Sequence, residues 1–326
     1  MSKNTREDLK IMQSWPLERK IMVTQARIIE WYKRFDGNVF VSFSGGKDST
    51  VLLDLVRRVC ADIPAVFVDT GLEYPENREF VKGFSNIEWL RPKYPFFEII
   101  EKYGYPVISK EVSNVIDGAR KGQQHRIKRI NGELLDSNGN ISIFNCPQYK
   151  YLLDAPFKIS DKCCYHMKKA PVYSYEYRTG RKGFIGTMAS ESLLRLQSWL
   201  ATGCNAFESK RPISRPMSFW TQQDVLMYLK VTGIKYSPIY GDIIETNTKN
   251  GAKLTTTGVT RSGCMFCMFG VQHDKIPNRF QKMQITHPKQ YDYCINKLGC
   301  GRVMDFIGVP YKNETEVLCV EHKQDK

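Results

Sequence analysis

The sequence contains no apolar run long enough to cross a membrane, since a spanning helix needs about 20 consecutive apolar residues. Residues 1–8 also lack the apolar stretch of a secretory signal. We therefore expect a cytoplasmic protein with no membrane partner. Internal repeats and low-complexity linkers are missing as well. The 326 residues are enough for one large domain or two modest ones.

Acidic residues are few compared with basic ones: 34 Asp and Glu stand against 48 Lys and Arg, giving a net charge of +14. A positive field attracts phosphate-rich partners, so nucleic acid is one candidate partner. A surface that serves an anionic nucleotide, or only solubility, is the alternative. No zinc-finger, RNP or helix-turn-helix motif favours nucleic acid.

The densest basic cluster lies in a polar, turn-rich segment, residues 118–156, which we interpret as an insertion covering the mouth of the active site. Asn131-Gly132 and Asn138-Gly139 predict hairpin turns within it. The cluster comprises Arg120, Lys121, His125, Arg126, Lys128 and Arg129.

The most informative segment is an apolar run, 39–43, that ends in Ser-Gly-Gly-Lys-Asp-Ser at 44–49. The pattern predicts a buried strand, a tight loop and then a helix. Gly45 and Gly46 have no Cβ, so their backbone can approach an anion closely. The helix N-terminus adds free N–H groups, and Lys47 adds a cation. The segment therefore predicts a phosphate-binding loop, although its spacing is not that of the Walker motif.

Further apolar segments alternate with amphipathic ones, which predicts an α/β fold. We expect a doubly wound, mostly parallel sheet of about five strands with flanking helices. The predicted organisation is a helical lead-in at 1–36, a nucleotide-binding domain at 37–235 and a C-terminal subdomain at 236–326. The strands after the first are predicted at 65–68, 87–90, 107–110 and 183–187.

The loop resembles the PP-loop of the ATP pyrophosphatases and their relatives, the adenylyl-sulfate and phosphoadenylyl-sulfate reductases. Other blocks match this family in the same order between about residues 38 and 270. They are Asp-Thr-Gly at 69–71 with Pro-Glu at 75–76, Glu-Ser at 191–192 with Arg195, and Trp-Thr at 220–221 with Asp-Val at 224–225. Met188 replaces an arginine often found in the family, so one anion contact of the family is missing here.

The resemblance implies an adenine nucleotide, ATP or a sulfonucleotide, bound at the carboxyl ends of the strands. Lys47 and Asp48 would be catalytic: the lysine would stabilise a leaving pyrophosphate and the aspartate would hold Mg²⁺. The implied nucleotide-binding residues are Ser42, Ser44, Gly45, Gly46, Lys47, Asp48, Ser49, Asp69, Thr70, Gly186, Glu191, Ser192 and Arg195.

Ten cysteines in a reducing compartment are unlikely to form structural disulfides, so their spacing matters more. Cys163 and Cys164 are adjacent, and Cys264 and Cys267 form Cys-Met-Phe-Cys. Four converging thiolates can bind zinc or an iron–sulfur cluster, and spacing alone does not separate the two. Adjacent cysteines suit one small tetrahedral ion poorly. In the iron–sulfur adenylyl-sulfate reductases, which the pattern resembles, such pairs hold a [4Fe–4S] cluster. The resemblance thus implies this cluster here.

Two reactions compete. The reductases use a C-terminal cysteine as nucleophile, and Cys319 followed by Glu321 and His322 only loosely matches that motif. The reductases also commonly lose the loop lysine, whereas this chain keeps Lys47. We therefore favour ATP pyrophosphatase chemistry, in which an adenylated acceptor receives sulfur. Either reaction would involve a protein that donates sulfur or electrons. An inactive nucleotide- or nucleic-acid-binding regulator is the alternative from another class.

Overall fold

The computed structural model describes residues 4–249 and 251–313. These residues form two compact units, each built from two separate stretches of chain. Unit 1 comprises Met1–Pro92 and Ala170–Gly263, and unit 2 comprises Lys93–Lys169 and Cys264–Lys326. These boundaries differ from the predicted ones at 37 and 236, because sequence patterns divide a chain into contiguous pieces whereas packing does not.

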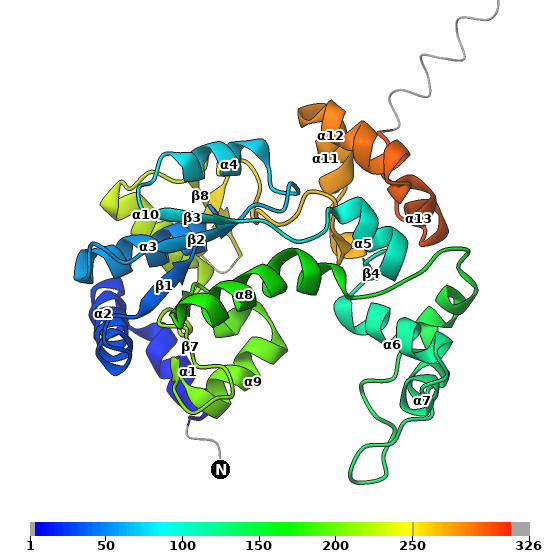
Figure 1. Ribbon diagram of the computed structural model, residues 1–326, viewed down its shortest axis with the longest axis horizontal. Coiled ribbons are helices and arrows are strands. Elements are labelled where there is room, and N and C mark those ends of the chain that lie inside the picture. The colour runs from blue at the N-terminus through cyan, green and yellow to red at the C-terminus, as the bar shows by residue number, and fades with distance from the viewer. Residues whose placement is uncertain (1–3, 250, 314–326) are drawn as a thin grey trace, which may run out of the picture. The chain divides into compact units, whose positions relative to one another are not determined.

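Unit 1 is built around a six-stranded sheet with the order β3-β2-β1-β5-β7-β6. All neighbours are parallel except β6 and β7, and β1, β2 and β3 lie side by side in Figure 1. The predicted α/β fold with a mostly parallel sheet is therefore confirmed. The strands are β1 (Val39–Ser42), β2 (Ala65–Val68), β3 (Ile87–Leu90), β5 (Lys182–Ile185), β6 (Asn205–Ala206) and β7 (Ile213–Ser214).

Both faces of this sheet are covered, because side chains alternate between them along a strand. From β1, Val39 and Val41 enter the main core, to which α2, α3 and α10 contribute several residues each. Phe40 points the other way and joins Val66 and Tyr175, the last from α8. The helices of unit 1 are α1 (Arg6–Ser14), α2 (Leu17–Arg34), α3 (Lys47–Val59), α4 (Pro75–Lys82), α8 (Ala170–Thr179), α9 (Leu193–Thr202) and α10 (Gln222–Thr232).

Local sequence signals fix several helix ends in unit 1. Thr221 caps α10 through a reciprocal pair of hydrogen bonds with Asp224, as its Thr-x-x-Asp pattern predicts. After α10 the chain forms an antiparallel hairpin of β8 (Ile243–Thr248) and β9 (Gly251–Thr256). The chain then continues through residues 257–263 to the end of unit 1.

Unit 2 is mostly helical around a short parallel pair, in which Met268 and Phe269 of β10 (Met268–Phe269) lie beside β4 (Val107–Ile108). Its other elements are α5 (Phe96–Tyr103), α6 (Lys110–Arg120), α7 (Gln124–Asn131), η1 (Pro147–Asp154), η2 (Tyr165–Lys169), η5 (Val271–His273), α11 (Arg279–Thr286), α12 (Pro288–Asp292), η6 (Tyr293–Lys297) and α13 (Cys300–Phe306). Within residues 4–249 and 251–313, every helix is too short or too polar to span a bilayer.

One predicted hairpin in the basic insertion is wrong. Gly132 is left-handed, with φ of 84°, and ends α7 rather than turning a hairpin. An Asn-Gly pair serves both purposes, because both need a residue with positive φ. The second pair fits its prediction better, since Leu135 and Ile141 flank it in an antiparallel bridge.

Candidate nucleotide site and cysteine cluster

The PP-loop joins β1 to α3 through two glycines, each required for a different reason. Gly45 adopts φ of 70°, and a Cβ there would lie 2.9 Å from Val81 Cγ2 and 3.1 Å from the carbonyl oxygen of Asn77. Gly46 has ordinary dihedral angles and is the N-cap of α3, with no side chain capping the helix. The N-cap residue therefore leaves the N–H groups of the first turn of α3 uncovered, as anion binding requires, and only the N–H of Lys47 is bonded to a side chain from elsewhere, Tyr240.

Serine hydroxyls hold the loop in this shape. Ser49 donates to the carbonyl oxygen of Gly46 at 2.8 Å and accepts the backbone N–H of Ser44 at 3.2 Å. Gly46 donates its N–H to Ser44 Oγ at 3.3 Å. In this state, two of the predicted binding residues, Ser44 and Ser49, mainly maintain the conformation of the loop.

Lys47 and Asp48 bring opposite charges together at the start of α3. Lys47 Nζ lies 3.2 Å from Asp48 Oδ1, and the lysine side chain is only 3% exposed. Burial raises the pKa of Asp48, although the charge of Lys47 acts in the opposite direction. A carboxylate that is poorly solvated and only partly neutralised is a good ligand for a further cation.

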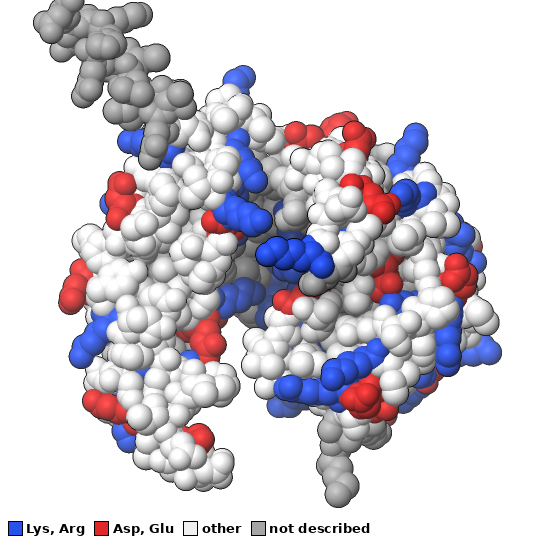
Figure 2. Space-filling view, turned by 180° about the vertical axis from the view of Figure 1, so that it is seen from behind, with Lys and Arg blue, Asp and Glu red and all other residues white. Residues whose placement is uncertain are grey.

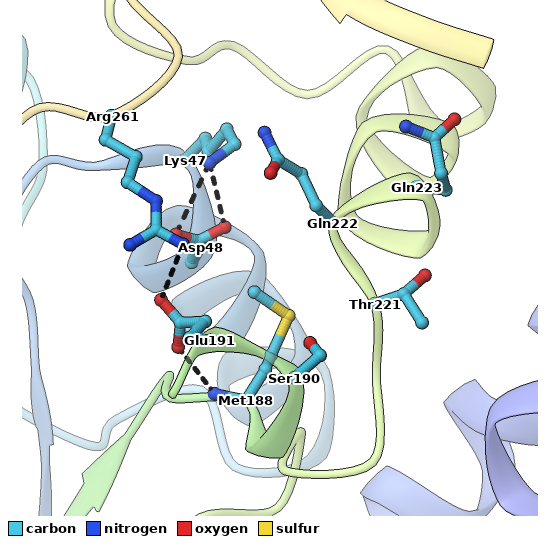
Figure 3. Close-up of a pocket in the computed structure, with 9 residues that line it drawn as sticks. All are labelled: Lys47, Asp48, Met188, Ser190, Glu191, Thr221, Gln222, Gln223 and Arg261. Carbon is cyan, nitrogen blue, oxygen red and sulfur yellow. Dashed lines mark hydrogen bonds and ion pairs between the residues drawn. The ribbon is translucent and has the colours of Figure 1, made fainter. Parts of the chain in front are cut away.

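Both residues line a pocket of about 290 Å³ in unit 1 (Figure 3). In this view Arg261 and Glu191 lie to one side of Lys47 and Asp48, Gln222 lies to the other, and Met188 lies at the lower edge. The volume is at the small end of the range for ligand sites. The remaining lining residues are Ser190, Thr221 and Gln223.

Glu191 links the family-like block at 188–195 into one ion-pair network. Its carboxylate accepts the backbone N–H of Met188 at 2.8 Å and pairs with Arg195. Arg261 Nη2 lies 4.0 Å from Glu191 Oε1. Ser192 accepts the N–H of Arg195 and thereby caps α9. Of these five residues, Met188, Glu191 and Arg261 line the pocket, whereas Ser192 and Arg195 do not.

Arg261, Ser262 and Tyr240 were missed as site residues by the sequence reasoning. Tyr240 accepts the backbone N–H of Lys47 at 3.1 Å, and its hydroxyl lies 2.6 Å from Ser262 Oγ. Tyr240 ends the segment Tyr-Ser-Pro-Ile-Tyr at 236–240, whose two tyrosines around a proline were the available signal. Nothing in the local sequence marks Arg261 or Ser262.

Other predicted nucleotide-binding residues do not line this pocket. Asp69 pairs with Arg78 at 2.7 Å, and Thr70 donates its hydroxyl to Glu73 at 2.7 Å. Gly186 matters for packing, because a Cβ there would lie 3.0 Å from the carbonyl oxygen of Asp48. Ser42 is the last residue of β1, where it pairs with β2 and β5. Their role in nucleotide binding stays a prediction.

The four predicted cysteine ligands all belong to unit 2, and their thiols interact. Cys163 donates to Cys164 Sγ at 4.0 Å, and this hydrogen bond lowers the pKa of Cys164 to about 6. Lys110 and Lys168 act in the same direction. The same hydrogen bond, burial and the charges of the other three thiols raise the pKa of Cys163.

The Cys-x-x-Cys pair forms a turn, in which the N–H of Cys267 bonds to the carbonyl oxygen of Cys264 at 3.2 Å. Burial raises the pKa of Cys267, against a hydrogen bond from the backbone of Phe269. In the part of the chain that the structure describes, no group of three or more His, Cys, Asp or Glu side chains is placed to hold a metal ion. The metal site stays a prediction, and Cys319 lies outside the described residues.

Comparisons with known proteins find similarity in the segment that contains the PP-loop. A model of the phosphoadenosine phosphosulfate reductase domain matches residues 38–90, which run from β1 to β3. Adenosine 5'-phosphosulfate reductase 2 of Bacillus subtilis is 22% identical over 221 residues, which cover 67% of this chain and 74% of the relative. The resemblance to the sulfonucleotide reductase family is confirmed. It is strongest in the loop segment and weaker elsewhere.

Two further similarities of this chain are either shorter or found by comparing structures. An uncharacterized protein of Methanocaldococcus jannaschii is 38% identical over 95 residues, but the match spans only 23% of its length. The solved phosphoadenylyl-sulfate reductase from Candida auris, in a phosphate complex, gives a TM-score of 0.40 at 14% identity, covering 72% of this chain and 91% of that one.

Proposed function

We propose that the chain is a PP-loop enzyme of the reductase family that binds ATP and adenylates an acceptor for sulfur transfer. An acceptor oxygen would attack the α-phosphorus, pyrophosphate would leave, and a sulfur nucleophile would then displace AMP. The observation that carries this proposal is the pairing of Lys47 with Asp48 in one pocket at the N-terminus of α3, where the N-cap Gly46 has no side chain.

Each residue has a separate role in the proposed reaction. The first N–H groups of α3 and the ammonium of Lys47 would bind the phosphate chain and stabilise charge on the leaving pyrophosphate. Asp48 would hold Mg²⁺ between protein and phosphates, because a carboxylate with nearby phosphate oxygens is a typical Mg²⁺ environment. Arg261 would add a second cation at the same pocket.

The test is to incubate the anaerobically purified protein with Mg-ATP and candidate acceptors and to measure AMP and pyrophosphate. Lys47→Met should abolish both products, because it removes the cation that would stabilise the leaving pyrophosphate. Lys82→Met is the matched control, since Lys82 lies on the exposed surface of α4, where it pairs with Glu79. Equal losses in the two variants would contradict the proposal.

We also propose that Cys163, Cys164, Cys264 and Cys267 bind a [4Fe–4S] cluster. The donor set suits it: the charges of Cys164, Cys264 and Cys267 act on Cys163, and Lys110 and Lys168 lower the pKa of Cys164 and so favour its thiolate. Such a cluster would supply a place to hold sulfur or to pass electrons. The lysines would stabilise the thiolates, and the backbone N–H of Phe269 would orient Cys267.

Iron and zinc analysis with an anaerobic absorption spectrum tests this second proposal. Cys264→Ser should lower the iron content, whereas Cys204→Ser should not, because Cys204 is buried in the core of unit 1. A full complement of zinc with no iron, or iron binding that survives Cys264→Ser, would contradict it.

Reduction of a sulfonucleotide is the second candidate, and the similarity to the adenosine 5'-phosphosulfate reductases favours it. Thiol-dependent release of sulfite from adenylyl sulfate would support it. Loss of that activity in Cys319→Ser, with no AMP formed from ATP, would place this reaction ahead of the first.

A further inference from the structure

Net charge does not by itself point to a binding surface in this protein. On the face shown in Figure 2, Lys and Arg side chains are scattered and mixed with Asp and Glu. The predicted basic cluster is also partly used internally. Arg120 donates to four backbone carbonyls of residues 152–157, and Arg129 is buried against Glu111 and Phe144.

A different group in unit 2 combines cations with aromatic rings. Lys102 Nζ lies 5.9 Å from the ring centroid of Tyr94 and 5.4 Å from that of Tyr103. Lys93 Nζ lies 5.3 Å from the Tyr94 ring. We call the group the ring–lysine surface, and it comprises Lys93, Tyr94, Lys102, Tyr103, Tyr165 and His166.

The rings continue from α5 onto η2. His166 stacks on Tyr103 with centroids 4.4 Å apart and planes at 16°, and Tyr165 meets His166 edge-on at 5.2 Å. Tyr94 is 37% exposed and Tyr165 47% exposed, so part of each side chain is accessible to a ligand. The surface thus alternates cations and rings over two elements of one unit.

The charges around these rings are mainly positive. Segments 93–110 and 158–169 contain seven Lys and Arg residues against three Asp and Glu residues. Burial and the charges of Lys102 and Lys162 lower the pKa of His166, so these lysines lie close to the stacked rings. The acidic side chains of α5 are Glu98 and Glu101, and Lys158 caps the end of the same helix.

We propose that the ring–lysine surface binds single-stranded nucleic acid. Unstacked bases stack on exposed tyrosines, and lysines neutralise the phosphates between them, which is how proteins bind single strands without reading their sequence. An acidic polypeptide would satisfy the lysines but would leave the rings unused. A duplex keeps its bases stacked on one another and would leave them unused too.

The position of the ring–lysine surface in the chain suggests a role for the bound nucleic acid in the reaction. Tyr165 and His166 follow Cys163 and Cys164 directly in the chain, so a bound strand lies beside these thiols. A base or backbone oxygen of the strand is then the acceptor in sulfur transfer. This last step rests on the proposed function, whereas the binding itself does not.

The test is fluorescence anisotropy with the full-length protein and labelled strands of about 15 nucleotides, a length suited to one binding module. Single-stranded RNA, single-stranded DNA of the same sequence and an RNA hairpin duplex are the three probes, without ATP. We expect tighter binding of the single strands than of the duplex, and the comparison of RNA with DNA identifies the source of the strand. Omitting ATP separates this result from the fate of the proposed reaction.

Variants at exposed positions locate the binding. Tyr165→Ala should weaken binding about ten-fold, as loss of one stacked base predicts. Lys102→Gln should weaken it and lower the slope of log affinity against log salt by about 0.7. Tyr177→Ala, at a tyrosine 94% exposed on α8, and Lys230→Gln on α10 are the matched controls in unit 1 and should have no effect.

Three results would overturn the proposal. One is failure of the unmodified protein to bind any single strand at about 50 mM salt, where phosphate contacts are strong. Another is equal binding by the surface variants and the controls. The third is competition by polyglutamate as effective as by unlabelled strand, since that would show a charge-only surface.

Discussion

The hydroxyl of Tyr240 accepts the backbone N–H of Lys47 at 3.1 Å, across 193 residues of sequence. This N–H is the first of α3 and belongs to the set that would face a phosphate. In this structure the Tyr240 hydroxyl thus takes one of the hydrogen bonds that the anion site would offer to a phosphate. A phosphate that binds the loop in the proposed manner must take this N–H from Tyr240.

The first prediction follows from this exchange. Tyr240→Phe should destabilise the ligand-free protein by about 1–2 kcal/mol, because a buried N–H loses its partner. Pyrophosphate should restore most of that loss, since its oxygens can accept the same N–H. Thermal unfolding with and without pyrophosphate measures both effects.

Tyr236→Phe is the control for this experiment. Tyr236 donates its hydroxyl to the carbonyl oxygen of Gly241 at 3.0 Å and has no hydrogen bond to the loop. Its loss of stability should not respond to pyrophosphate. If pyrophosphate raises the melting temperature of the two variants equally, the exchange does not occur.

The second prediction concerns Gly45. Gly45→Ala should lower the free energy of unfolding by about 2 kcal/mol. Part of this comes from the strain of a left-handed alanine and part from a contact of 2.9 Å between the new Cβ and Val81. Gly71→Ala isolates the strain, because Gly71 has φ of 75° and nothing within 4 Å of a Cβ. It should cost only about 1 kcal/mol. Urea unfolding of the two variants should therefore differ, and equal costs would show that α4 yields to the new methyl group.

The strand–loop–helix of the PP-loop could be predicted from sequence because its signals are local. An apolar run, two glycines and an amphipathic helix all occur within residues 39–59. The capping of α10 by Thr221 is equally local. The fold class followed from the alternation of such segments. The structure adds β6 and β7 to the sheet, whose two residues each are too short to show a period, and it places the strand predicted at 107–110 outside the sheet, as β4 of unit 2.

The rest of the site depends on contacts between distant segments. Arg261 and Ser262 reach the loop because the β8–β9 hairpin returns the chain to it, and neither residue has a motif. Asp69 and Thr70 match a sequence block of the family, yet the side chain of Asp69 is paired with Arg78 and that of Thr70 with Glu73. Whether a polar side chain is already paired with a residue three or nine positions away cannot be judged from residue type alone.

The third prediction is a pH dependence. Burial raises the pKa of Asp48 above 3.8, with Lys47 opposing it, and a protonated Asp48 cannot hold Mg²⁺. AMP formation should therefore fall as the pH drops through this raised pKa, earlier than for an ordinary aspartate. The profile of kcat/KM reports this group in the free enzyme.

Two neighbours should shift that profile in opposite directions. Glu191 raises the pKa of Asp48 and Arg261 lowers it. Glu191→Gln should consequently move the acid limb to lower pH, and Arg261→Gln should move it to higher pH. Shifts in the same direction would mean that another group controls the limb.

The last prediction concerns the support of the Cys-x-x-Cys turn. Arg279 binds Asp274 through two hydrogen bonds of 2.7 and 2.8 Å. It also donates Nη1 to the carbonyl oxygens of Cys267 and Phe269, both at 3.3 Å. One guanidinium thus connects the start of α11 to the turn that carries the cysteines. A lysine has the charge but cannot fill both positions, because its ammonium is a single point.

Arg279→Lys should therefore lower the free energy of unfolding by about 2 kcal/mol at neutral pH, which is typical for the loss of a charge-assisted hydrogen bond to a partly buried group. Although burial acts to raise it, the pKa of Asp274 is lowered overall by Arg279. A lowered pKa contributes stability above the unfolded value, and this contribution is lost as the pH falls through the folded value. The difference between Arg279→Lys and the unmodified protein should shrink accordingly in acid. Arg302→Lys, an exposed change in the same unit, should show little effect at either pH, and a pH-independent difference for Arg279→Lys would mean that the carbonyl contacts, not Asp274, carry the stabilisation.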